Sequence, residues 1–231
     1  MGRKCLLLFT MLLLVSCMGC SPSGETVIMP PSRIGTEMEE VAKIQIPARS
    51  MADAYRDSVA VAHVKVGNWL GGTEDREDLH FTYFEATTVK TFKGDLPESF
   101  VLVQYGDTKV TWINYPLYTY GDELLVFLTP YAFYDEPENI PRENTYRILG
   151  DFTTALNTAF DKDGNVYYID SVGHMGKFTD LPRQNGNDDV FNAVREDLTA
   201  RDPLIAETAF TYPFYVYSEA DVEQLFKSIA D

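Results

Sequence analysis

The sequence predicts a mainly β, α+β domain: a small antiparallel barrel of five to seven short strands, with C-terminal helices packed on it. The chain has 231 residues, of which 45% are hydrophobic and 13% aromatic, so it can bury one good core. Its 14 Tyr and 14 Phe favour strands, because aromatic side chains suit a half-buried pleated surface. Short apolar runs recur between turn-rich segments, and a clear helical period follows only after residue 187.

The N-terminus predicts a leader that ends in a lipidated cysteine. Residues 1–16 have a basic start and then an apolar run, which is shorter than the roughly 20 residues that a membrane-spanning helix needs. Leu14-Val15-Ser16-Cys17 resembles the bacterial lipobox, in which the cysteine is diacylated and becomes the new N-terminus. We therefore expect lipid at Cys17, with Cys20 as the rival position. An ordinary cleaved signal peptide is the alternative.

The segment after the leader is predicted to be a tether. Residues 17–47 contain several prolines and serines, and residues 21–33 have no apolar period of either kind. A barrel domain over residues 48–182 and a helical extension over residues 183–231 are expected to follow. All three cysteines lie within the first twenty residues, so the domain itself needs no particular redox environment.

The barrel strands are predicted from alternating or continuous apolar runs. One or two helical turns at residues 48–57 lead into a strand at 58–66. Further strands are expected at 80–92, 100–105, 123–129, 145–149 and 165–170. The central turns contain Lys93-Gly94-Asp95 and Gly121-Asp122, and Asp161-Lys162-Asp163-Gly164 reads as a hairpin turn in preference to a calcium loop.

Two helices are predicted after the boundary at Leu181-Pro182. The first shows apolar residues at helical spacing, with two acids near its start. The second begins at Ser218, which can cap it, and presents an apolar face. The apolar positions are Val190, Phe191, Val194 and Leu198 in the first helix, and Val222, Leu225, Phe226 and Ile229 in the second. We expect both helices to cover the barrel.

The central run resembles a known family. Residues 89–95, the strand at 100–105 and residues 115–128 resemble bacterial surface lipoproteins with a netrin/metalloproteinase-inhibitor-like (OB-type) β-barrel. In that module a strand closes with a Lys-Gly turn, and a Gly-Asp or Gly-Glu turn precedes a Tyr/Leu-rich strand. The resemblance implies an OB-like barrel. It does not carry over protease inhibition, because the animal inhibitors use a free N-terminal cysteine that a lipidated Cys17 would not offer.

Charge and motifs exclude several functions. The formal net charge is −16, or −18 without the leader, which holds Arg3 and Lys4 and no acid. Such a field repels phosphate, so nucleic acid is not an expected partner. The sequence shows no nucleophile elbow, phosphate loop or dinucleotide fingerprint. His63, His80 and His174 lie in separate elements without metal-ligand spacing, so no catalytic residue, metal or cofactor is predicted.

The ligand-binding candidates are aromatic. They are Trp112, Tyr115, Tyr118 and Tyr120. Aromatic side chains offer a large contact area at low entropic cost and could stack on sugars or grip a peptide. The alternative is that they fill the barrel. Pro116 and Gly121 break the alternation, so the sequence leaves both possibilities open.

The hypothesis for the whole chain is a non-enzymatic protein, lipid-anchored to a bacterial cell membrane on its extracytoplasmic side. Its expected partners are the membrane, through the N-terminal lipid, and an extracytoplasmic protein or cell-wall component. The alternative is an envelope-associated hydrolase or processing enzyme, with an active site around His174 or His63.

Overall fold

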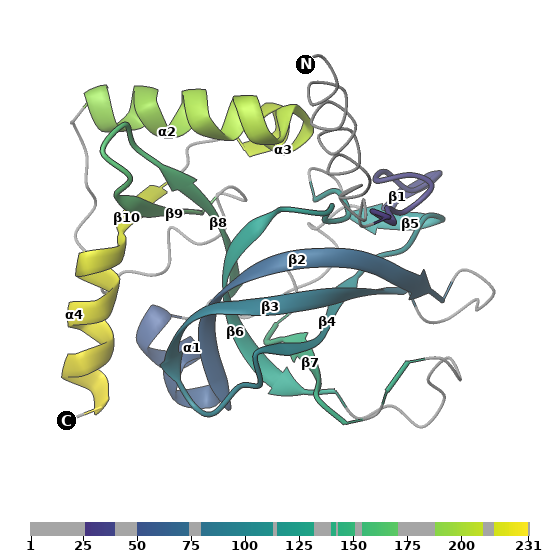
Figure 1. Ribbon diagram of the computed structural model, residues 1–231, viewed down its shortest axis with the longest axis horizontal. Helices are drawn as coiled ribbons and strands as arrows, with labels where there is room; N and C mark the ends of the chain where they lie inside the picture. Colours follow the sequence, from purple (N-terminus) through teal and green to yellow (C-terminus); the bar gives the residue numbers. More distant parts are fainter. Residues whose placement is uncertain are drawn as a thin grey trace, which may run out of the picture.

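The computed structural model describes nine ranges of the chain. They are residues 26–39, 50–73, 80–112, 115–131, 140–141, 143–150, 154–170, 188–209 and 215–230. These ranges form an eight-stranded sheet, a small two-stranded sheet and four helices (Figure 1). None of the helices within them is long and apolar enough to cross a membrane.

Five strands of the large sheet close into a barrel. They are β2 (Ala60–Gly72), β3 (Phe81–Lys93), β4 (Ser99–Tyr105), β7 (Thr145–Ile148) and β6 (Glu123–Pro130), in that order around the barrel. The ring closes because β6 pairs with both β7 and β2. This is an OB-like strand order, so the predicted fold class is confirmed.

One pair in the barrel is parallel, whereas the sequence analysis expected an antiparallel barrel. β4 pairs parallel with β7, and the other four neighbours pair antiparallel. A closed ring with an odd number of strands cannot alternate direction throughout. One parallel pair is therefore required by closure.

Alternate residues of the barrel strands fill its interior. Ala62 and Val64 of β2 pack there with Phe84 of β3 and Leu102 of β4, all fully buried. Small residues on β2 leave room for the rings of β3 and of the segment before β6, which contributes Tyr118. The alternating pattern that predicted β2 is thus the inward face of the barrel.

Three further strands extend the sheet from β6. β8 (Ala155–Phe160) pairs with Leu124–Val126 of β6, and β9 (Val166–Asp170) and β10 (Tyr215–Ser218) follow in order. β8 and β9 form an antiparallel hairpin around Asp161, whose carboxylate accepts the backbone N–H groups of Asp163 and Asn165. The predicted hairpin turn is confirmed.

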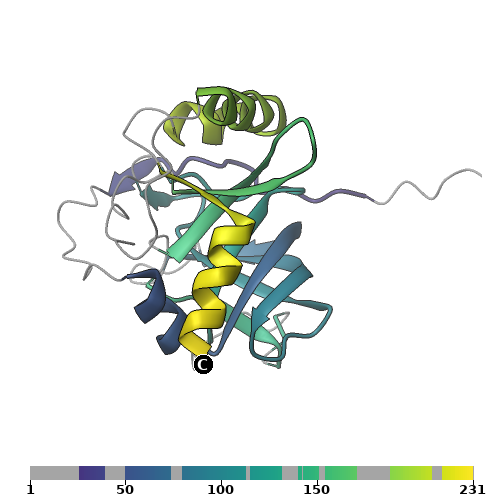
Figure 2. The ribbon, with the colours of Figure 1, turned by 90° about the vertical axis from the view of Figure 1, so that its left-hand side faces the viewer.

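The helices cover two different surfaces of this sheet. α1 (Met51–Asp57) and α4 (Glu219–Ala230) share a core with outward residues of the barrel strands, including Phe127. α2 (Asp188–Arg201) and α3 (Pro203–Ala209) pack against the β8–β10 extension instead, as Figures 1 and 2 show. Helices thus form where the sequence predicted them, but α2 does not cover the barrel itself.

Part of the predicted tether is docked on the barrel. Ile28 N donates to Asn68 Oδ1 at 2.9 Å, and Trp69 N donates to Ile28 O at 2.8 Å. Farther along, β1 (Glu37–Glu39) pairs parallel with β5 (Val110–Trp112). The flexible tether expected over residues 17–47 is therefore wrong for residues 26–39, because strand edges of the domain satisfy their backbone groups.

Candidate functional site

Two adjoining cavities lie along α4, and Glu223 lines both. We call them together the α4 groove. The first has a volume of about 480 Å³ and lies between the β8–β9 turn and the start of α4. The second has a volume of about 270 Å³ and lies between α4 and the end of β3. The first is lined by Gly164, Asn165, Val166, Tyr167, Ser218, Glu219, Ala220 and Glu223, and the second by Tyr55, Lys90, Thr91, Phe92, Glu223, Phe226, Lys227 and Ala230.

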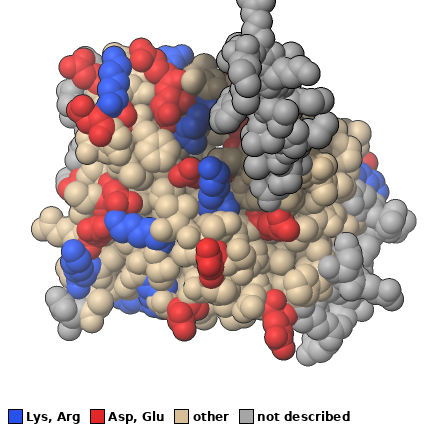
Figure 3. Space-filling view, in the orientation of Figure 1, with Lys and Arg blue, Asp and Glu red and all other residues tan. Residues whose placement is uncertain are grey.

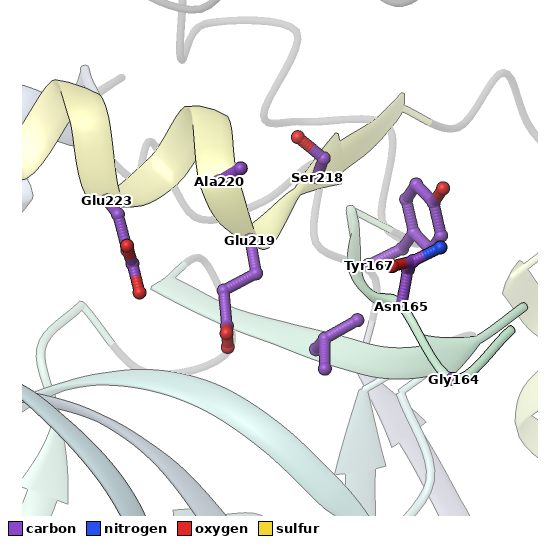
Figure 4. Close-up of a pocket in the computed structure, with 8 residues that line it drawn as sticks. Gly164, Asn165, Tyr167, Ser218, Glu219, Ala220 and Glu223 are labelled. Atoms are coloured by element: carbon purple, nitrogen blue, oxygen red, sulfur yellow. The ribbon is translucent and has the colours of Figure 1, made fainter.

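The first cavity has polar walls on opposite sides. Glu219 and Glu223 extend from the first turns of α4 in the same direction, as Figure 4 shows. Asn165 and Tyr167 come from the β8–β9 hairpin at the other end of the cavity. Ser218 is committed to the helix cap, because its Oγ accepts Asp221 N at 3.2 Å and donates to Asp221 Oδ2 at 2.6 Å.

Lys90 joins the two cavities electrostatically. Its Nζ donates to Glu219 Oε1 at 2.6 Å and to Glu223 Oε1, and it lies 5.2 Å from the centre of the Phe92 ring. Burial acts to lower the pKa of Lys90, but the hydrogen bonds to the two carboxylates outweigh burial, so the pKa is raised. The hydrogen bond from Lys90 lowers the pKa of Glu223. Acidic and basic side chains accordingly lie side by side over α4 in Figure 3.

Tyr168 connects this ion cluster to the core. Its hydroxyl donates to Glu219 Oε2 at 2.7 Å, while its ring is fully buried beneath α4. Burial and the hydrogen bond to Glu219 raise the pKa of Tyr168. Both oxygens of Glu219 therefore have a donor, and the first turn of α4 is fixed to strands β3 and β9.

The second cavity has an aromatic wall. The rings of Tyr55 and Phe226 stack with centroids 4.6 Å apart, and Phe92 meets Phe226 edge to face at 5.6 Å. Lys90 and Phe92 are two residues apart on β3, so they share the face that looks toward α4. The groove thus runs from a polar compartment to an aromatic one.

The aromatic residues predicted from the sequence lie at different depths. Tyr115 and Tyr118 are only 6% and 1% exposed, and their hydroxyls contact each other inside the barrel. Gln104 holds this segment inward, because it donates to Pro116 O at 3.0 Å and accepts Tyr118 N at 2.8 Å. Tyr115 and Tyr118 therefore fill the barrel, which was the alternative to a ligand surface.

The other two aromatic candidates differ from this pair. Tyr120 is 39% exposed, in the turn before β6. The backbone of Trp112 lies in β5, and its side chain is outside the described residues. The structure therefore does not bring the four candidates together on one surface.

The two histidines within the described ranges are paired with carboxylates in separate places. His63 is buried, and its Nε2 lies 2.9 Å from Glu123 Oε2, a hydrogen bond that lowers the pKa of Glu123. His80 Nδ1 lies 3.0 Å from Asp107 Oδ2. Within the described ranges no group of three or more His, Cys, Asp or Glu could hold a metal ion. Cys17, Cys20 and His174 lie outside those ranges.

The residues of the α4 groove were not predicted as a site. Lys90 and Glu219 are 129 positions apart, and each alone reads as an ordinary surface charge. The available signal was the helix cap at Ser218, which predicts where α4 begins and so places Glu219 and Glu223 in its first turns. It does not reveal that β3 ends beside them.

Comparisons with protein-family models, with curated proteins and with solved structures gave no match for this chain. The functional argument therefore rests on the geometry of the domain itself.

Proposed function

We propose that this protein is a non-enzymatic binding module, held on the outer side of a bacterial membrane by lipid at Cys17. We propose further that the α4 groove takes an extended peptide segment of an extracytoplasmic protein. The observation that carries this proposal is the pairing of a polar and an aromatic cavity along one helix, with Glu223 between them.

The shape of the groove suits an extended chain. α4 has 12 residues and is therefore about 18 Å long at 1.5 Å per residue. An extended peptide rises about 3.3 Å per residue, so roughly five of its residues could lie along the helix. An apolar side chain would enter beside Phe92 and Phe226, and a polar one would reach Asn165 and Glu219.

The chemistry of the groove favours binding over catalysis. Lys90 forms ion pairs with both Glu219 and Glu223, and the lowered pKa of Glu223 makes its carboxylate a weaker base. Ser218 Oγ is occupied in the helix cap. These groups are arranged to hold a fixed polar surface rather than to exchange protons with a substrate.

A peptide-display selection on the full chain tests this function. Ala220 is exposed and lines the first cavity, so Ala220→Trp fills the groove without removing a native contact. Selected peptides should bind this variant at least about tenfold more weakly, since the ring occupies their site. Gln224→Trp is the matched control, because Gln224 is exposed on α4 and lines neither cavity. Equal binding to both variants, or cleavage of the bound peptides, would contradict the proposal.

The anchor is tested separately by mass spectrometry of the mature N-terminus. A diacylglyceryl group on Cys17 is the expected result, and Cys17→Ser should release the protein from the membrane fraction. Lipid on Cys20 would show that the rival cysteine is the attachment site. An unmodified terminus beyond Cys20 would refute lipidation.

A further inference from the structure

Large apolar side chains are exposed along the docked N-terminal segment and in the turn beside it. Seven large apolar side chains are well exposed among the described residues, and five of them lie on this segment or in the turn that touches it. The five are Val27, Ile28, Met29, Ile34 and Tyr120, each between 39% and 58% exposed. We call these five residues the apolar strip. The other two are Val59, between α1 and β2, and Val89, within β3.

Hydrogen bonds to the barrel fix the apolar strip in place. Ile28 is joined to Asn68 and Trp69 of β2 through its backbone N–H and carbonyl groups. Thr119 Oγ1 lies 3.3 Å from Met29 Sδ, which brings Met29 beside the turn that carries Tyr120. The exposure of these side chains is therefore set by the fold.

The apolar strip is also the part of the domain nearest to the predicted anchor. Val27 follows Cys17 by ten residues, which span at most about 33 to 36 Å when fully extended. Figure 2 shows the purple N-terminal segment crossing the molecule and leaving at its edge. A lipid on Cys17 would therefore keep this edge of the domain within about 36 Å of the bilayer.

We propose that the apolar strip rests on the lipid bilayer when Cys17 carries its lipid. This inference rests on the anchor in the proposed function. Lipid anchoring raises the local concentration of bilayer around the strip, so five side chains need to supply only a modest partition energy. The contact positions the domain with the N-terminal segment toward the membrane and leaves the α4 groove for its partner.

The charge of the protein determines which bilayer fits. Without its leader the chain has a formal net charge of −18, so it is repelled by anionic headgroups, and the apolar strip itself contains no charged residue. The contact must therefore come from apolar side chains at the level of the headgroups and upper acyl chains. Phosphatidylcholine vesicles should support it better than phosphatidylglycerol vesicles.

Lipid photocrosslinking on the full chain tests this contact. The protein is purified from bacterial membranes and reconstituted in phosphatidylcholine vesicles that contain a phosphatidylcholine with a diazirine on its acyl chain. Proteolysis and mass spectrometry then locate the lipid adducts. We expect adducts on Val27–Met29 and Tyr120, and about tenfold fewer in Ile28→Glu, because a charged side chain is excluded from the apolar layer. Val89→Glu is the control, since Val89 is exposed on β3, and it should leave the yield unchanged.

The possible outcomes distinguish the membrane contact of the apolar strip from the lipid anchor at Cys17. A lipidated protein whose adducts are absent, or as frequent at Val89 as at Met29, overturns the membrane contact and leaves the anchor standing. If the intact mass shows no lipid, the anchor fails. The membrane contact is then tested with the protein held on the vesicles by an N-terminal His tag and a nickel-chelating lipid. Absence of lipid adducts in that experiment would contradict the contact. A second copy on the strip would block the adducts and form a dimer that Ile28→Glu dissociates, which also rejects the membrane contact.

Discussion

Arg33 and Asp202 join segments that are 169 positions apart through a two-pronged ion pair. Arg33 Nη1 and Nη2 donate to the two carboxylate oxygens of Asp202 at 2.9 and 2.7 Å. Arg33 Nε also donates to Leu117 O at 2.7 Å, and Nη2 lies 3.6 Å from Asp122 Oδ2. One side chain therefore ties the docked N-terminal segment to the loop before β6 and to the α2–α3 junction.

Replacing Arg33 should destabilise the whole fold. Arg33→Ala leaves the carboxylate of Asp202, whose side chain is only 5% exposed, without its cation. We expect the free energy of unfolding in urea to fall by about 3 kcal/mol. The free energy of unfolding of Arg33→Lys should lie between those of the wild type and Arg33→Ala, because lysine keeps the charge but loses the two-pronged geometry. Arg56→Ala is the control, since the Arg56–Asp53 pair is exposed and should matter little. Equal stability of the Arg33 and Arg56 variants would contradict the role of this ion pair.

Asp122 should make stability fall as the pH rises. Burial, together with the charge of Asp202, raises the pKa of Asp122 to about 7, although Arg33, the Thr119 N–H and Arg201 act to lower it. In the unfolded chain the pKa is near 4, so only the folded state keeps this proton between pH 4 and 7. The contribution is therefore complete below the unfolded pKa and is lost as the pH rises through the folded one.

The variant Asp122→Asn tests this titration. Asn keeps an oxygen that can accept Thr119 N, as Asp122 Oδ2 does at 2.8 Å, but it does not ionise. The stability of Asp122→Asn relative to the wild type should increase between about pH 4 and pH 8, by at most about 4 kcal/mol. Urea unfolding at a series of pH values measures this difference. Parallel profiles for the two proteins would show that Asp122 does not titrate in this range.

The sequence predicted the barrel because its signals are local. Alternation in β2 and the turns at Gly94 and Gly121 depend on neighbouring residues, and the core confirms the strands that they delimit. β8 and β10 were not predicted. β8 places Asn157 and Thr158 within its apolar run, and β10 has only four residues and leads directly into α4. β8 pairs with β6 and β10 pairs with β9, and no local pattern in the sequence indicates these distant partners.

The N-terminal segment and the α4 groove were beyond local reasoning. Residues 21–33 show no apolar period from which docking could be predicted. Backbone hydrogen bonds, including the one from Leu117 N to Arg33 O, hold the docked segment, and their partners lie far along the chain. The groove depends on β3 ending beside α4. For the aromatic candidates, hydrogen bonds with Gln104 hold the segment of Tyr115 and Tyr118 inside the barrel. The spacing of the aromatic residues in the sequence does not predict these bonds.

Tyr118 should behave as a core residue. Its ring is buried against Phe84 in the barrel, and burial raises the pKa of its hydroxyl. We expect Tyr118→Ala to lower the free energy of unfolding by about 4 kcal/mol, and Tyr118→Phe by about 1 kcal/mol for the lost hydroxyl contact. Tyr120→Ala, at the exposed turn, should change it by less than about 0.5 kcal/mol. Thermal unfolding followed by near-ultraviolet circular dichroism distinguishes these cases. A Tyr118→Ala protein as stable as Tyr120→Ala would contradict the core role.

Gly94 and Gly121 have similar backbone conformations but different surroundings. Their φ angles are 77° and 94°, a region that other residues adopt only with strain. A Cβ on Gly94 would lie 2.3 Å from Val59 O and 3.1 Å from Ala60 Cα, whereas one on Gly121 would meet nothing within 4 Å. Gly121→Ala should therefore cost only backbone strain, about 1 kcal/mol.

Gly94→Ala must in addition push the start of β2 away from the turn, so it should cost about 3 kcal/mol or more. Asn tolerates this backbone conformation better than Ala, which separates strain from crowding. Gly121→Asn should recover most of the stability lost in Gly121→Ala, while Gly94→Asn should recover little, because its Cβ meets the same carbonyl of Val59. Urea unfolding of the four variants measures both effects. If Asn rescued both positions equally, backbone strain alone would explain the two glycines, and the close approach of the turn to β2 would not constrain the barrel.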